Sequence, residues 1–194
     1  MHSPFLLLYV KIFGIIITIS EVLNMNEKVR LTLDNEKYLD IELYPDVAPI
    51  SVKNFLKLVD QKFFNGVIFH RIIRDFMVQT GGYKLDGNNL IEAGEAETIK
   101  GEFESNGIKN DLAHTLGVVS MARTSIKDSA SSQFFICTAD APHLNGQYAA
   151  FGKVVGEESY KVLEELNQSR TEFVNNMFAD FPYPFITVKS IERI

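Results

Sequence analysis

From residue 25 onward the chain consists of short segments with strand patterns, and this feature constrains its fold more than any other. Apolar and polar residues alternate over residues 29–33 and again over 39–43, on either side of the turn Asp34-Asn35-Glu36. This arrangement is typical of a β-hairpin. Other short apolar runs predict further strands at residues 67–72, 76–79, 116–121, 133–138, 149–155 and 186–191.

Two segments have helical spacing. Apolar residues recur at i, i+3, i+4 and i+7 from Val52 to Val59, which predicts an amphipathic helix that ends near Gln61. A second helix is expected over residues 159–167. The polar, glycine-bearing residues 83–110 are expected to form a long surface connection.

This order of elements favours a mostly β fold. Many short strands with two helices and no regular βαβ alternation argue against a doubly wound parallel sheet. Closing an antiparallel sheet into a barrel removes its exposed edges, and two helices can cap the ends. We therefore expect one domain, residues 25–194, folded as a closed antiparallel barrel capped by two α-helices.

Composition excludes several classes of function. The net charge is −6 and the basic residues are scattered singly, so no nucleic-acid partner is expected. The four histidines lack metal-ligand spacing, so no metal is expected. No cofactor is expected either. Cys137 is the single cysteine and lies in an apolar run, which favours a small buried side chain over a nucleophile.

Residues 1–24 form an apolar leader that differs from the rest of the chain. Fifteen of these 24 residues are apolar, but Lys11 interrupts the stretch and no small-residue cleavage site follows. We expect an over-long start, with translation beginning at Met25 and a cytoplasmic protein. The alternatives are a membrane anchor or export through residues 5–23, and the protein would meet a membrane only if the leader is a real anchor.

The segment Phe69-His70-Arg71-Ile72 carries the first sign of chemistry. Strand alternation places Phe69 and Arg71 on one face and His70 and Ile72 on the other. An arginine among aromatic and methionine side chains, with Gln79 close behind, suggests an apolar pocket beside a fixed charge. An arginine whose stem covers an ordinary core strand is the alternative reading of this segment alone.

Three sequence blocks together resemble the cyclophilin family of peptidyl-prolyl cis–trans isomerases. They are FHRIIRDFMVQTGG at 69–82, LGVVSMART through SSQFFICTADAPHLNGQYAAFGKV at 116–154, and the closing strand. The resemblance extends from about Val29 to Ile191. It implies an eight-stranded barrel and an enzyme that accelerates rotation about X–Pro peptide bonds and so assists protein folding.

The resemblance also implies site residues. Arg71 matches the catalytic arginine, and Gln79 the glutamine that binds the substrate backbone. Two positions depart from the best-known members, since His143 replaces a common tryptophan and Tyr148 a common histidine, and weak cyclosporin binding is expected. Arg74-Asp75 replaces Pro-Gly, and Thr80 replaces a glycine. The substrate-binding residues implied are Phe76, Met77, Gln79, Ala122, Phe135, His143, Leu144 and Tyr148.

An arginine over an apolar pocket fits this chemistry. The amide resists rotation with a barrier of about 18–20 kcal/mol. A permanent cation such as Arg71 can stabilise the twisted amide, because it can donate to the nitrogen or hold the carbonyl. The expected partners are proline-containing polypeptides, and the expected state is a monomer. The chief rival is a proline-recognising binding module or chaperone accessory with little turnover.

Overall fold

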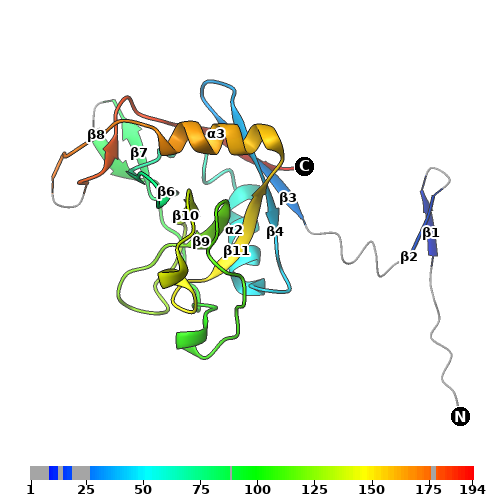
Figure 1. Cartoon of the computed structure of the whole chain (residues 1–194). Coiled ribbons are helices and arrows are strands. Elements are labelled where there is room, and N and C mark those ends of the chain that lie inside the picture. The colour runs from blue at the N-terminus through cyan, green and yellow to red at the C-terminus, as the bar shows by residue number, and fades with distance from the viewer. Residues whose placement is uncertain (1–8, 13–14, 19–26, 88, 176–177) are drawn as a thin grey trace, which may run out of the picture.

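The computed structural model describes residues 9–12, 15–18, 27–87, 89–175 and 178–194 (Figure 1). Within the leader, β1 (Tyr9–Ile12) pairs antiparallel with β2 (Ile15–Thr18). The expected start at Met25 lies outside the described residues. In the described ranges, no helix is both long and apolar enough to cross a membrane.

Eight strands form the main sheet. Their order is β14-β3-β4-β11-β9-β10-β6-β5, and every pairing is antiparallel. The fold is therefore mostly β, as the sequence pattern predicts. The strands are β3 (Lys28–Leu33), β4 (Tyr38–Leu43), β5 (Arg71–Ile73), β6 (Met77–Thr80), β9 (Val118–Met121), β10 (Phe134–Cys137), β11 (Ala150–Val155) and β14 (Val188–Arg193).

The prediction of a closed barrel is not confirmed, because this sheet has two ends. No ladder joins β14 to β5 in the ranges that the structure describes. The chain before β5 changes partner from one residue to the next: Ile68 N–H donates to the Tyr83 carbonyl, and Phe69 N–H donates to the Ile186 carbonyl, each over 2.9 Å. The strands thus form a curled half-barrel, and irregular backbone bonds span the gap.

Two helices flank the sheet, as expected. The first, α2 (Pro49–Asp60), ends one residue before the predicted Gln61, and α3 (Glu157–Asn167) begins two residues before its prediction. Figure 1 shows α3 across the top of the sheet and α2 below it. Two single 3₁₀ turns, η1 (Glu104–Asn106) and η2 (Pro142–Leu144), lie in connections.

The connection after β6 contains structure that the sequence did not predict. Residues 83–110 were expected to be a plain surface loop, but β7 (Tyr83–Asp86) and β8 (Asn89–Glu92) pair there as a hairpin. A second small ladder joins β12 (Thr171–Glu172) to β13 (Phe181–Pro182). In both ladders apolar and polar residues alternate only weakly, so the sequence pattern does not identify these segments as strands.

The start of α2 is capped from a distant part of the chain. Ala48 at its N-cap offers no side-chain hydrogen bond. Glu102, only 1% exposed, instead accepts hydrogen bonds from the Ile50 and Ser51 backbone N–H groups, at 2.9 and 2.7 Å, and from the Ser51 hydroxyl. A carboxylate at this end also complements the helix dipole, so Glu102 fixes α2 to the loop.

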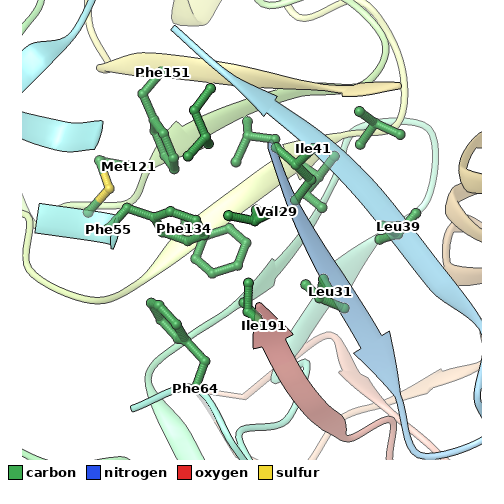
Figure 2. Close-up of a cluster of buried hydrophobic side chains, with 14 of the residues drawn as sticks. Val29, Leu31, Leu39, Ile41, Phe55, Phe64, Met121, Phe134, Phe151 and Ile191 are labelled. Atoms are coloured by element: carbon green, nitrogen blue, oxygen red, sulfur yellow. The ribbon is translucent and has the colours of Figure 1, made fainter. Parts of the chain in front are cut away.

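The largest core lies inside the curled sheet. Figure 2 shows side chains of β3 and β4 gathered with aromatic rings from α2 and β10. The Phe55 ring lies 5.3 Å from the Phe134 ring in an edge-to-face arrangement. Such aromatic packing adds about 0.5–1.5 kcal/mol per pair to the burial of apolar area.

Strand β10 is buried on both faces, and this positions the site. All four of its residues are buried. Phe134 and Ile136 belong to the main core, whereas Phe135 and Cys137 belong to a second cluster with Met77. Because alternate side chains of a strand point to opposite faces, the second cluster lies on the outer face of the sheet.

Candidate active site

One row of side chains crosses four strands on this outer face. Arg71 of β5 lies opposite Gln79 of β6, and Gln79 lies opposite Phe135 of β10. Phe135 in turn lies opposite Ser120 of β9. Directly opposite residues of antiparallel strands share a face, so the register alone brings a cation, an amide and an aromatic ring together.

A hollow of about 250 Å³ opens beside this row. Eight residues predicted from the sequence line it: Arg71, Phe76, Met77, Gln79, Ala122, Phe135, Leu144 and Tyr148. His143 is the predicted residue that does not line it. Its ring packs instead against Phe76, with the ring centroids 5.3 Å apart.

The hollow has an apolar floor and a charged rim. Met77, Phe135 and Leu144 are only 2–7% exposed and form one buried cluster. The Arg71 side chain is 45% exposed. A small apolar ring can therefore be buried next to a guanidinium that remains accessible from solvent.

Asp180 is an ionic partner of Arg71 that no motif in the sequence indicated. The Nε of Arg71 lies 3.6 Å from Oδ2 of Asp180, whose side chain is 38% exposed. Asp180 comes from the chain between β12 and β13, far from β5 in sequence. Since guanidinium carries five N–H donors, pairing near Nε leaves the terminal amino groups as donors.

Arg123 is a second guanidinium on the hollow that the sequence analysis missed. It donates from Nε and Nη2 to the Gln147 carbonyl, at 3.1 and 2.9 Å, and from Nη1 to the Thr124 carbonyl at 2.8 Å. Its Cζ lies 4.7 Å from the centre of the Tyr148 ring. Arg123 therefore fixes this wall, and its place beside Ala122 in the LGVVSMART block was the available indication.

Two further residues, Gln133 and His114, contact side chains of this row. Gln79 donates from Nε2 to Oε1 of Gln133 over 2.9 Å, which orients its amide. The His114 ring stacks on Phe135 with an interplanar angle of 19°, and its Nε2 lies 3.0 Å from the Ser120 hydroxyl. Gln133 lies within the SSQFF block, whereas His114 had no motif around it that pointed to this position.

The two substitutions without an expected effect now have structural explanations. Asp75 takes the position of a common glycine with φ of 56°, a left-handed conformation that Asp tolerates better than most residues. The Asp75 backbone N–H donates a hydrogen bond to Oδ1 of Asn167, in α3, over 2.8 Å. Thr80 is fully buried and donates its hydroxyl to the Ile68 carbonyl at 2.9 Å.

The predicted division of faces around Arg71 is wrong for Phe69. Phe69 and Ile72 both belong to the main core, while Arg71 points outward. The alternation fails because residues 67–70 do not form a continuous strand. His70 is buried, and it lines a hollow together with Arg71.

Burial is the main cause of the pKa shifts of His70, His114 and Cys137, which lie near the site. It lowers the pKa of His70 to about 4, and the neighbouring Arg71 charge adds to this lowering. Burial also lowers the pKa of His114. The pKa of Cys137 is raised to about 12, so this buried thiol stays protonated, and the prediction of a small buried side chain is confirmed.

Comparison with known proteins identifies the family. Residues 12–193 match the family described as cyclophilin type peptidyl-prolyl cis-trans isomerase/CLD. A peptidyl-prolyl cis-trans isomerase of Acinetobacter baylyi is 45% identical over 147 residues, covering 73% of this chain and 72% of that protein. Peptidyl-prolyl cis-trans isomerase A of Dickeya dadantii is 41% identical over 171 residues, covering 86% and 79%.

Solved structures agree with these relatives. A cyclophilin type peptidyl-prolyl cis-trans isomerase of Cryptosporidium parvum superposes with a TM-score of 0.69 at 26% identity, over 87% of this chain and 98% of that one. A second structure of it, in the presence of the dipeptide Ala-Pro, gives a TM-score of 0.67 at 27% identity, over 85% and 97%. The chain belongs to the cyclophilin-type family of peptidyl-prolyl cis–trans isomerases.

Proposed function

We propose that Arg71 catalyses the isomerisation of X–Pro bonds in this chain and that the 250 Å³ hollow holds the proline ring. The observation that carries this proposal is the row in which Arg71 and Gln79 lie beside the buried ring of Phe135. The reaction breaks no covalent bond, so the site needs to bind the ring and to favour the twisted amide over both planar isomers.

The apolar floor supports the binding part of this task. Met77, Phe135 and Leu144 offer a proline ring contact with side chains that are already buried and held in place. Gln79, whose amide is oriented by Gln133, hydrogen-bonds the substrate backbone on the other side. With the ring and the backbone both held, the bond between them is the part of the substrate left free to rotate.

The guanidinium supports the rate acceleration. When the amide twists, its nitrogen loses conjugation and becomes a better hydrogen-bond acceptor. A guanidinium is a permanent cation, so Arg71 donates without a proton-transfer step. One preorganised donor of this kind is typically worth about 2.7–4 kcal/mol, or roughly 10²–10³ in rate.

A proline-binding module with little turnover would use the same apolar floor. Arg71 favours the enzyme, because recognition of an apolar ring does not require a cation. The test is the isomerisation rate of a short proline peptide, measured by NMR exchange, with wild type, Arg71→Ala and Arg30→Ala. Arg30 is a matched control, since its side chain is 40% exposed and also pairs with an aspartate, Asp40.

We expect Arg71→Ala to lower kcat/KM about 10²–10³-fold while the peptide still binds, and Arg30→Ala to retain wild-type turnover. Undiminished turnover in Arg71→Ala would show that the role given to Arg71 is wrong. A wild type that does not accelerate the reaction would leave the binding module as the better description.

We also propose that the protein acts on proline-containing polypeptides as a cytoplasmic monomer whose translation starts at Met25. The interrupted apolar stretch around Lys11 supports a start after the leader, and a net charge of −6 opposes self-association. Mass spectrometry of the natural protein tests the start, because a chain that begins upstream of Met25 and fractionates with membranes would contradict it. Light scattering tests the monomer.

A further inference from the structure

A second hollow adjoins the proposed proline pocket. It has a volume of about 360 Å³, within the range of about 300–1,000 Å³ that is common for ligand pockets. Arg71 and Gln79 line both hollows, so the two form neighbouring parts of one surface. Its far wall is not part of the main sheet: Phe178, Ala179 and Asp180 of the segment between β12 and β13 supply it.

This wall is tied directly to the catalytic edge of the sheet. Ile72 of β5 donates its backbone N–H to the Asp180 carbonyl over 2.9 Å. The Asp180 side chain pairs with Arg71. A polypeptide held at Arg71 therefore lies against this wall on one side of its proline.

The second hollow has an aromatic floor. The Tyr83 ring lies 4.9 Å from the His70 ring and 5.1 Å from the Phe178 ring, both in edge-to-face arrangements. His70 and Phe178 are largely buried, at 4% and 9% exposure. Burial holds His70 neutral above pH 6.5, so its ring adds an apolar face rather than a charge.

The aromatic contacts continue from this floor to the surface. Phe178 contacts Phe181, Phe181 contacts Phe185, and Phe185 contacts Tyr183, with ring centroids 5.7–6.0 Å apart. At the outer end Phe185 and Tyr183 are 45% and 52% exposed. The buried rings of Phe178 and Phe181 thus connect the hollow to two exposed aromatic side chains, and aromatic residues are enriched at recognition surfaces.

We propose that the second hollow is a substrate subsite that takes an aromatic side chain flanking the proline, so that the enzyme prefers such polypeptides. The proposal rests on the proposed function, because it places the substrate backbone at Arg71 and Gln79. The occupant is inferred from continuity: a chain whose proline fills the first hollow and whose backbone lies along Arg71 and Gln79 passes beside the second hollow, which these two residues also line. The rings around Tyr83 can pack edge-to-face against an aromatic side chain, and they offer no comparable contact to a small or charged one.

The test compares blocked peptides Ala-Ala-Pro-Ala-Ala in which phenylalanine replaces alanine at one position at a time on either side of proline. NMR exchange gives kcat/KM for each peptide without a coupling protease. In wild type we expect one flanking position on one side to raise kcat/KM about five- to tenfold over the all-alanine peptide.

Ala179→Trp is the matching variant, because Ala179 is exposed and lines the hollow, which a tryptophan would fill. It should remove the phenylalanine advantage, so that kcat/KM of the phenylalanine peptide falls to within about twofold of that of the all-alanine peptide on the same variant. Ile194→Trp is the control: Ile194 is 60% exposed at the chain end, which lies beside β3 and across the molecule from β7 and β8 (Figure 1). This control should keep the advantage.

Several outcomes would overturn the subsite while leaving the isomerase intact. These are equal turnover of all peptides, an advantage that persists in Ala179→Trp, or an equal loss for both peptides. If Ala179→Trp does not fold, intermolecular NOEs from the peptide phenylalanine decide the question in wild type. Contacts with Tyr83 and Phe178 support the subsite, and their absence refutes it. If the protein dimerises with increasing concentration and Phe185→Ser abolishes this, the exposed aromatic side chains bind a second copy of the chain rather than substrate.

Discussion

Acidification is expected to destabilise this protein through His70. The ring is 4% exposed, and its pKa falls from 6.5 in the unfolded chain to about 4 in the folded one, mainly because burial penalises the charged form. The unfolded chain therefore binds the proton more readily between these two values. The stability contributed by neutral His70 is complete above pH 6.5 and is lost as the pH falls toward 4.

The magnitude follows from the two pKa values. Between pH 7.5 and pH 5.0, protonation of the unfolded histidine lowers the free energy of unfolding by about 2 kcal/mol. Ordinary carboxyl pKa values are about 4, below this interval, so the change expected from His70 falls mainly in a range where histidines titrate. The loss would approach roughly 3 kcal/mol below pH 4, where acid unfolding of other groups overlaps with it.

Urea unfolding followed by far-UV circular dichroism measures this effect, since the chain contains no tryptophan. The comparison is between wild type and His70→Gln, which replaces the ring with a neutral side chain that does not titrate. Wild type should lose about 2 kcal/mol more than His70→Gln between pH 7.5 and 5.0. His114, whose pKa is also lowered by burial, is present in both proteins and cancels. The same pH dependence in both proteins would refute the reasoning.

Two stability predictions concern other buried side chains. Glu102→Gln should destabilise the protein by about 1.5–3 kcal/mol, because three hydrogen bonds at the start of α2 lose their charged acceptor. Glu97→Gln, 82% exposed beside the same helix, should cost less than about 0.5 kcal/mol in the same urea titration. Phe135→Ala should cost about 3–5 kcal/mol and raise KM for proline peptides, whereas Phe173→Ala, 67% exposed, should change stability little. A wild-type KM in Phe135→Ala would show that Phe135 is not part of the pocket floor.

The place of Phe135 in the pocket floor was predictable from sequence because its strand has a simple alternation. In β10, Phe134 and Phe135 are adjacent, so alternation sends one ring into the main core and the other to the outer face. The resemblance then indicated which ring faces substrate. Gln79 lies on the same face as Phe135, because it stands opposite Phe135 on β6, the neighbouring strand.

The gap between β14 and β5 could not be predicted in this way. Residues 67–70 read as a strand because they are apolar and buried, and a short apolar run gives no periodicity to say which neighbour each residue pairs with. In the structure Ile68 pairs with Tyr83 and Phe69 with Ile186, so burial is satisfied without a ladder. Sequence patterns encode burial directly and partner choice only indirectly.

The wall formed by the segment between β12 and β13 shows the same limit at the site itself. Asp180 lies among aromatic and proline residues with no strand or helix spacing, and only the backbone bond from Ile72 and the pairing with Arg71 place it at the active site. The residues proposed to bind a proline ring follow from strand alternation and from the family resemblance, both of which the sequence can reveal. The residues proposed to contact the rest of the polypeptide come from a loop whose position depends on tertiary contacts, so a preference for flanking residues has to be inferred from the structure.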